Sequence, residues 1–285
     1  PFDELAGVGV VFKLVCALEG NKNIEKLCAK YCDIVALGTV ADVMPIVGEN
    51  RIIVKKGLEI IKNRGCKGLN ALLDAAGIPA ESVNSTVLSF QIAPRINAAG
   101  RMGSAEKAVI LFVSDDVCEM NEIAVSLNEQ NLLRQEVEKS IYEEASERIK
   151  CSKEYKNENI LVVAEKGWHS GVIGIVASRL TDEFYKPSVM ITFEDGIGKG
   201  SLRSVKGFNI YEALKSVSHL LEKFGGHELA AGLTVKRGNL DEFRNKINEY
   251  ARRKFTDDMF KIRMEADMKL SMKDLTMSFA EEISA

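Results

Sequence analysis

A Gly-Gly-His triplet is the part of this sequence whose residue types are best suited to binding chemistry. It lies in Phe-Gly-Gly-His-Glu-Leu-Ala-Ala-Gly, residues 224–232. Glycines let a ligand approach the backbone, and successive N–H groups can converge on an anion. We expect His227 to open a short helix whose N-terminus adds partial positive charge. Gly225, Gly226 and His227 therefore predict a phosphate site, although a tight turn before a buried Ala-rich helix explains them equally well.

Three further segments carry polar residues between small ones. They are Gly-Thr-Val-Ala-Asp-Val-Met-Pro at residues 38–45, Ala-Pro-Arg-Ile-Asn-Ala-Ala-Gly-Arg-Met-Gly at 93–103 and Gly-Lys-Gly-Ser-Leu-Arg-Ser at 198–204. Ser201 and Arg203 are two residues apart in a predicted strand and so point to the same face. A hydroxyl and a guanidinium on one face suit a phosphate, which arginine can bind in a bidentate manner. An exposed polar strand face is the alternative.

The composition is that of a globular protein large enough for two domains. Of 285 residues, 46% are hydrophobic and 28% charged, and the net charge of -3 gives no global sign of nucleic-acid binding. Any such site must come from local clusters of Arg and Lys. The six cysteines form no Cys-x-x-Cys pair, which predicts reduced thiols in a cytoplasmic protein. Residues 5–18 are too short an apolar run to span a membrane and predict a buried helix.

The pattern along the chain predicts an α/β protein with two α/β domains joined by a long helix. Residues 33–38 are apolar and partly β-branched, which suits a buried strand of a parallel sheet. Asp42 would then follow the carboxyl end of that strand, where ligands bind in open α/β sheets. Helical patterns follow at residues 51–63, 69–76 and 105–112.

Residues 115–150 contain neither Gly nor Pro and repeat apolar residues at helical spacing, which predicts a long helix with at most one break, near Val125. A strand at 159–164, a helix at 171–181 and a strand at 188–193 then form a crossover unit. Further strands are predicted at 199–204 and 232–236, and further helices at 208–221 and 240–253.

Taken together, these segments resemble the RecJ family, which are single-strand-specific exonucleases of the DHH phosphoesterase superfamily. The resemblance implies the C-terminal part of a DHH domain at residues 1–114, a connecting helix at 115–150, a DHHA1 domain at 151–256 and the start of a truncated OB-type domain at 257–285. It also implies single-stranded DNA as substrate, 5′ to 3′ polarity, a role in DNA repair and recombination, and Mn²⁺ or Mg²⁺ as cofactor.

The same resemblance makes Asp42 a metal ligand and catalytic residue. A lone Asp is otherwise a turn or helix-capping residue, and phosphodiester hydrolysis with two cations needs several carboxylate and imidazole ligands. Asp115 and Asp116 are better explained as a helix start. Residues 1–9 resemble the segment that follows the Asp-His-His signature in RecJ, so the metal-binding front of the family is absent. We expect the chain to be a fragment that binds a strand without cleaving it.

The resemblance assigns DNA contact to Ser201, Arg203 and the Gly-Gly-His triplet. Arg95 and Arg101 flank an Asn-Ala-Ala-Gly turn that faces the cleft between the domains in the family. Arg101 is the better phosphate ligand, because Arg95 follows a proline and could equally brace the loop.

Asn97 could support either arginine. His169 matches the His-Ser-Gly-Val-Ile-Gly-Ile-Val-Ala segment of the family. Trp168 beside it could stack on a base, although a half-buried loop aromatic is the plainer interpretation.

Two other functions remain compatible with the sequence. One is a phosphodiesterase for short oligonucleotides or cyclic dinucleotides, whose members usually lack the long connecting helix. The other is a noncatalytic nucleic-acid-binding module, because related Gly-Gly-His domains accompany alanyl-tRNA synthetases; the segment around Asp42 argues against it. The sequence indicates no protein partner and no membrane association.

Overall fold

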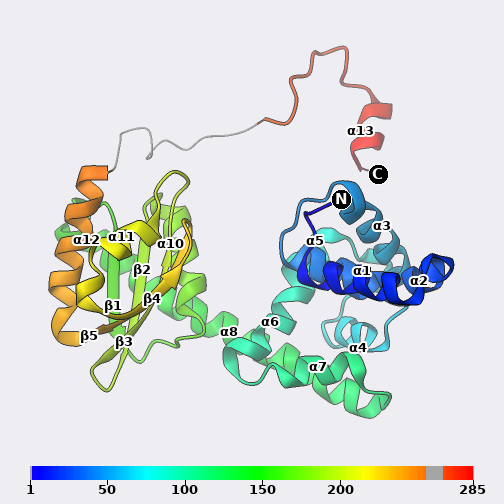
Figure 1. Ribbon diagram of the computed structural model, residues 1–285, viewed down its shortest axis with the longest axis horizontal. Helices are drawn as coiled ribbons and strands as arrows, with labels where there is room; N and C mark the ends of the chain where they lie inside the picture. Colours follow the sequence, from blue (N-terminus) through cyan, green and yellow to red (C-terminus); the bar gives the residue numbers. More distant parts are fainter. Residues whose placement is uncertain (1, 255–265, 285) are drawn as a thin grey trace.

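The computed structural model describes residues 2–254 and 266–284, which form two units joined by one long helix (Figure 1). Among the described residues, the N-terminal unit consists of helices, whereas the C-terminal unit contains a five-stranded sheet. The α/β class that the sequence predicts is therefore correct, but the strands all lie in the second unit.

Helices of the N-terminal unit surround one core. The helices predicted at residues 51–63, 69–76 and 105–112 are confirmed. In order, the elements are α1 (Gly7–Glu19), η1 (Asn21–Asn23), α2 (Ile24–Ala41), α3 (Gly48–Lys62), α4 (Lys67–Ala75), η2 (Ala80–Ser82), α5 (Ser85–Val87), the π-helical η3 (Leu88–Ile92), α6 (Ala93–Met102) and α7 (Glu106–Val113).

The strand predicted at residues 33–38 is wrong, because these residues lie inside α2. Asp33 is buried there, and its carboxylate accepts the N–H groups of Ile34 and Cys66 at 2.8 Å each. A six-residue apolar run cannot distinguish a strand from a buried helix. In this case burial continues to Val40, one turn beyond Ala36 and Leu37. Asp42 consequently caps a helix instead of following a strand.

The buried helix predicted at residues 5–18 is also wrong in part. One face of α1 packs against α2 through Phe12 and Cys16, which are buried. Four apolar side chains on the rest of the helix are 56% to 78% exposed, namely Val10, Val11, Leu14 and Leu18. The helix therefore has a large apolar surface that no described residue covers.

Helix α8 (Val117–Cys151) connects the units and runs unbroken for 35 residues, so the break left open near Val125 does not occur. Asp116 caps its N-terminus by accepting the N–H groups of Cys118 and Glu119, as the sequence predicts for a helix start. The buried residues of its first part belong to the N-terminal core and those of its last part to a core of the C-terminal unit. They are Met120, Ala124 and Leu127, and then Ile141, Ala145 and Ile149.

Strand order in the C-terminal sheet is β1-β2-β3-β5-β4, with β1 and β2 parallel and the other pairs antiparallel. The predicted strand-helix-strand unit is confirmed as β1, α10 and β2. The elements are α9 (Lys153–Lys156), β1 (Leu161–Lys166), α10 (Ile173–Phe184), β2 (Ser188–Glu194), β3 (Ile197–Arg203), α11 (Ile210–Ser216), η4 (Ser218–Leu220), β4 (Leu221–Gly226), β5 (Ala230–Lys236), η5 (Arg237–Asn239) and α12 (Leu240–Lys254).

The helix predicted after the Gly-Gly-His triplet is wrong, because the triplet joins β4 to β5. Ala231, Leu233 and Val235 are buried at every second position, so the period of a strand extends back into the predicted helix. Gly226 has a φ of 148°, and a Cβ there would lie 2.4 Å from the carbonyl oxygen of Ala230. The fold therefore requires glycine at this reversal.

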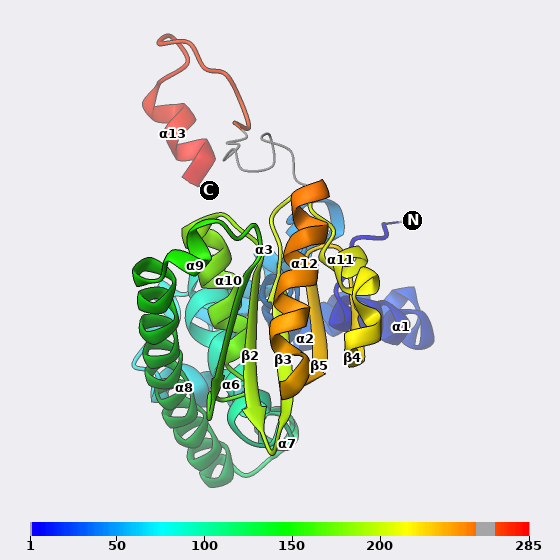
Figure 2. The same cartoon turned by 90° about the vertical axis from the view of Figure 1, so that its left-hand side faces the viewer.

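Helices cover the two faces of the sheet unequally (Figure 2). On one face α11 and α12 pack on the side chains of β1, β2, β3 and β5. On the other face α8 and α10 pack on β1 and β2, and α10 also packs on β3. The part of this second face that is formed by β5 and β4 stays largely free of helices.

The C-terminal segment contains helix α13 (Met277–Ser284). Of the predicted OB-type start at residues 257–285, positions 257–265 and 285 lie outside the described residues. Within 2–254 and 266–284, no helix combines the length and the apolar character needed to cross a membrane.

Glu158 provides a test of the C-terminal packing. Its side chain is 8% exposed, and burial raises the pKa of its carboxyl from 4.5 to about 7, although Arg244 and Lys186 lie nearby. The folded state then holds a proton that the unfolded state releases, so stability falls as the pH rises from about 4.5 to 7. We expect Glu158→Gln to raise the free energy of unfolding at pH 8 by up to about 3 kcal/mol.

At pH 4.5 the same substitution should have little effect, because the carboxyl is then neutral in the folded protein. Urea unfolding followed by the fluorescence of Trp168, the single tryptophan of the chain, reports on this unit. An equal effect of the substitution at both pH values would contradict the assignment.

Candidate nucleic-acid interface

Arg203 and Ser201 lie side by side on β3, on the face of the sheet that α10 partly covers. Nη1 of Arg203 donates to Oγ of Ser201 at 3.2 Å and to the carbonyl oxygen of Leu202 at 2.8 Å. Both side chains are half-buried. They lie over the start of α10, where a Cβ at Gly174 would be 2.9 Å from Oγ of Ser201 and 3.4 Å from Nη2 of Arg203. The alternation in the sequence therefore predicted correctly that these two side chains share a face.

Arg101 approaches the same place from the N-terminal unit. It lies in the last turn of α6, and its Nη1 donates to the carbonyl oxygen of Gly171 at 3.3 Å. The two units touch here, since a Cβ at Gly171 would be 2.3 Å from the carbonyl oxygen of Arg101. Residues 93–103, where the sequence predicts a turn between Arg95 and Arg101, are helical up to Met102, so α6 fixes the position of this guanidinium.

The guanidinium groups of Arg101 and Arg203 are close enough to repel each other. Burial is the main cause that lowers the pKa of Arg203, and the charge of Arg101 is the second. Burial also lowers the pKa of Arg101, followed by the charge of Arg134 on α8, while Glu138 opposes these effects. An anion placed between the two arginines would remove this repulsion. Such an anion would touch both units.

A group of ionic contacts between α8 and α10 lies near Arg101. Glu138 accepts Nη1 of Arg134 at 2.5 Å and Nη1 of Arg179 at 3.0 Å, and Asn131 accepts Nη2 of Arg134 at 2.8 Å. The carboxylate of Glu138 is 12% exposed and is shared by two guanidiniums. Its charge also acts on Arg101, where it opposes the lowering of the pKa by burial and by Arg134.

His169 lies in the β1–α10 loop beside Gly171. Its Nδ1 accepts the N–H of Gly171 at 3.2 Å, so a neutral imidazole carries its proton on Nε2 and can donate it to a ligand. Trp168 is 7% exposed, and its indole N–H donates to Glu144 at 2.8 Å. The tryptophan packs against the end of α8, and stacking on a base is excluded by its burial.

Gly225 and Gly232 extend the open face from Ser201 to the edge of the sheet. Ser201 pairs with Gly232 on β5, and Gly232 pairs with Gly225 on β4. A Cβ at Gly225 would meet nothing within 4 Å, and one at Gly232 would meet only the carbonyl oxygen of Gly200, at 3.7 Å. Packing gives no reason for glycine at these two positions, but close approach of a ligand to the backbone does.

His227 follows this glycine strip in the β4–β5 turn and is exposed. Its backbone N–H donates to Ala230 at 2.8 Å, and its Nδ1 accepts the N–H of Leu229 at 3.4 Å. As in His169, the proton of the neutral ring is on Nε2 and faces away from the turn. The imidazole is a donor at the rim of the strip, without the contribution from a helix N-terminus that the sequence analysis expected.

Arg95 and Asn97 lie farther from this cluster, on α6. Nε of Arg95 donates to Oδ1 of Asn128 at 2.9 Å and its Nη1 donates to the carbonyl oxygen of Gln91 at 2.5 Å. The bond to Asn128 braces α6 against α8, so Arg95 has the bracing role that was the alternative to phosphate binding. Asn97 is exposed and lines a mostly apolar pocket of about 250 Å³ together with Asp42.

Asp42 ends α2 in a strained turn. The N–H of Met44 bonds to the carbonyl of Thr39 and that of Val43 to the carbonyl of Val40, a Schellman arrangement that usually has glycine at the position of Val43. Val43 has a φ of 55° and is 82% exposed, so its own packing does not offset the strain. Strain next to an exposed carboxylate is a common property of functional sites.

The described residues do not fit a two-cation centre. In residues 2–254 and 266–284, no group of three or more His, Cys, Asp or Glu side chains is arranged to hold a metal ion. Asp42 could supply one ligand, and no reaction step through a metal can be derived from this chain.

Several contributors to the site were not predicted from the sequence. Gly171, Gly174 and Gly232 matter because of what lies opposite them in space, which one sequence does not show. Lys199 could have been found, because it continues the alternation of Ser201 and Arg203 by one step toward the N-terminus of β3.

The DHHA1 domain family matches residues 157–253 of the chain. The single-stranded-DNA-specific exonuclease RecJ of Bacillus subtilis is 38% identical over 286 residues, which are 100% of this chain and 36% of the relative. The chain thus spans about a third of this curated relative, and about half of the RecJ of Escherichia coli, to which it is 34% identical.

Solved structures agree with these matches. The crystal structure of RecJ in complex with Mg²⁺ from Thermus thermophilus is similar with a TM-score of 0.76 and 35% identity, covering 87% of this chain and 38% of that one. A crystal structure of exonuclease RecJ bound to manganese is similar with a TM-score of 0.77 and 34% identity, covering 92% of this chain and 64% of that one.

The glycines of the open strip should tolerate a methyl group, whereas a glycine whose Cβ would point at core side chains should not. We expect Gly232→Ala to leave the urea midpoint of the C-terminal unit unchanged or slightly higher, because alanine is less flexible in the unfolded state. Gly200→Ala should destabilise by about 1–3 kcal/mol, because its Cβ would lie 2.8 Å from Leu233 and 3.1 Å from Ile191. Equal losses in the two variants would contradict a free strip at Gly232.

Proposed function

Because this chain is homologous to RecJ exonucleases along its whole length, we propose that it forms the strand-holding part of a single-stranded-DNA-specific 5′ to 3′ exonuclease. The complete enzyme would hydrolyse phosphodiester bonds with Mn²⁺ or Mg²⁺, in the repair and recombination of DNA. This chain would bind the strand without cleaving it, since one carboxylate cannot hold two cations.

The observation that carries this proposal is the meeting of Arg101 and Arg203 from the two units. Arginine forks bind phosphate in a bidentate manner, and Oγ of Ser201 adds a hydroxyl beside one of them. The imidazole of His169 adds a donor from the loop that carries Gly171. A phosphate group held here would contact α6, β3 and the start of α10 at once.

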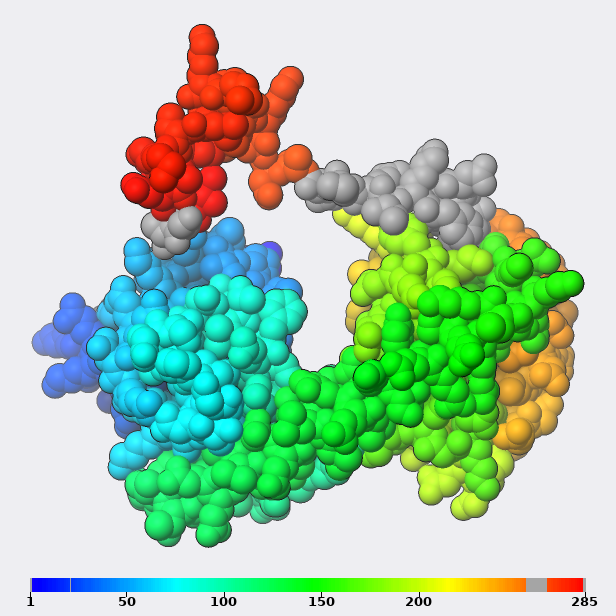
Figure 3. Space-filling view, turned by 180° about the vertical axis from the view of Figure 1, so that it is seen from behind, coloured from blue at the N-terminus to red at the C-terminus, as the bar shows by residue number. Residues whose placement is uncertain are grey.

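The glycine strip gives the rest of the strand a path. From Ser201, the backbone surface at Gly232 and Gly225 leads to His227 at the edge of the sheet. An extended single strand can lie against such a surface, with its phosphates near backbone and imidazole donors. Figure 3 shows the open space between the two units above α8. We propose that this space admits one strand and excludes a duplex.

The proposal predicts binding of a single strand and its dependence on Arg203. Fluorescence anisotropy in chelator and at low salt should show that a labelled 5′-phosphorylated strand binds more tightly than its duplex. Arg203→Ala should weaken strand binding about tenfold or more, because a charge-assisted contact is lost. It should also reduce the slope of log affinity against log salt by about 0.7.

Arg253→Ala is the matched control, because it removes the same charge from an exposed position on α12, on the opposite face of the sheet. An unchanged salt slope in Arg203→Ala, or the same change in both variants, would refute the assignment of Arg203. If neither the single strand nor the duplex binds, the proposal that this chain binds a strand is refuted.

The proposal also predicts the outcome of a nuclease assay. With Mn²⁺ present, release of mononucleotides from the 5′-phosphorylated strand by this chain should not exceed release by its Asp42→Asn variant, because the metal ligands are too few. Chromatography of the products measures both. Turnover that disappears in Asp42→Asn would show that a working metal centre exists in this chain.

A further inference from the structure

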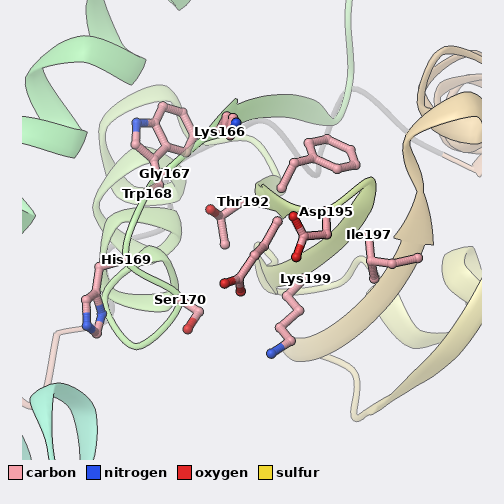
Figure 4. A pocket seen from close by; sticks show the side chains of 11 residues that line it. Lys166, Gly167, Trp168, His169, Ser170, Thr192, Asp195, Ile197 and Lys199 are labelled. Carbon is pink, nitrogen blue, oxygen red and sulfur yellow. The ribbon is translucent and has the colours of Figure 1, made fainter.

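A pocket of about 650 Å³ lies next to the phosphate site and has no role in the proposal above. It opens at the carboxyl ends of the parallel strands β1 and β2, where α/β units bind ligands. Figure 4 shows Trp168, His169 and Ser170 of the β1–α10 loop on one side, Asp195, Ile197 and Lys199 of the β2–β3 hairpin on the other, and Thr192 between them. Its volume is in the range of pockets for small organic ligands.

The lining chemistry does not favour a second phosphate. Glu194 and Asp195 contribute two carboxylates, and Lys166 and Lys199 contribute two amines. The carboxylates would repel an anion, whereas they would accept hydrogen bonds from a neutral ring with amino groups. Trp168 and Phe193 line the pocket but are 7% and 4% exposed, so Ile197, at 38%, is its accessible apolar side chain for such a ring. A nucleobase combines these properties.

The polar groups of the pocket are available for a ligand. Among residues 2–254 and 266–284, the side chains of Glu194, Asp195 and Lys199 take part in no hydrogen bond or ion pair. The φ of Asp195 is 47° and that of Gly196 is 80°, so a tight hairpin turn explains the type of residue at 195. No such turn explains a glutamate at position 194, so the carboxylate of Glu194 is the stronger indication of a ligand.

The pocket is continuous with the phosphate site along β3. Lys199, Ser201 and Arg203 alternate on the strand and so share one face. Successive members are about 6.7 Å apart along the strand, a step that one nucleotide of extended backbone can cover. His169 belongs to both places, since it lines the pocket and bonds to Gly171 beside Arg101.

We propose that this pocket binds the base of a nucleotide adjacent to the phosphate between Arg101 and Arg203, with Glu194 accepting an exocyclic amino group of that base. This inference rests on the proposed binding of a single strand. Lys199 contacts the phosphate that links the two nucleotides. Because a carboxylate only accepts hydrogen bonds, cytosine, with its amino group, fits better than thymine, which presents a carbonyl at the same position.

The test uses the full chain and 5′-phosphorylated strands of thymidines in which a single dC replaces dT at one of the first four positions. Anisotropy should show that one of these strands binds about tenfold more tightly than the all-dT strand. Glu194→Gln should abolish that preference, because the amide can also donate to the carbonyl of thymine. Asp182→Asn, which makes the same change of charge at an exposed position on α10, should keep it.

Asp195→Asn provides a second variant, because asparagine tolerates the positive φ of the turn. It should reduce the preference less than Glu194→Gln does. Equal affinity of the wild-type chain for all five strands would overturn the base pocket and leave strand binding intact, as would a preference that persists in Glu194→Gln. Failure of every strand to bind would overturn strand holding and the base pocket together.

Discussion

The approach of Arg101 to the start of α10 brings the two units together at the candidate site. The guanidiniums of Arg101 and Arg203 are partly removed from water, and the charge of Arg101 further lowers the pKa of Arg203. Without a ligand this costs free energy, which the packing of α6 and α10 on α8 has to offset. Because the charges are already in place, an anion that enters the site needs little rearrangement of the protein. Under the proposed function, a phosphate held by one arginine from each unit would also hold the units together.

The sequence predicted the local structure correctly where its residues fit only one periodicity, either that of a helix or that of a strand. The absence of Gly and Pro predicted α8, and alternation predicted the shared face of Ser201 and Arg203. Prediction failed for short apolar segments. Residues 33–38 suit a strand as well as a helix, and only the neighbouring helices of the N-terminal core decide between them. The residues after His227 contain alanines, but the alternating burial of Ala231, Leu233 and Val235 makes them a strand.

The site was predicted in its residue types more than in its geometry. Arginine, serine, histidine and glycine are residues that hold phosphate, and their positions could be chosen from the sequence. The sequence could not show which arginine is available to a ligand. The partners of Arg95, which are Asn128 on α8 and the carbonyl of Gln91, are known only from the structure. The glycines show the same limit. Gly200 and Gly226 are required by contacts across the sheet, whereas Gly225 and Gly232 face open space.

Helix α8 belongs to two hydrophobic cores at once, and this has a consequence for folding. Met120, Ala124 and Leu127 complete one core, while Ile141, Ala145 and Ile149 complete the other. A helix within a protein gains most of its stability from tertiary packing. Loss of either core therefore removes support from half of the helix and shortens the segment on which the other core is built. The two units are thermodynamically coupled through a shared element, so a variant that loosens one of them also lowers the cooperativity with which the other unfolds.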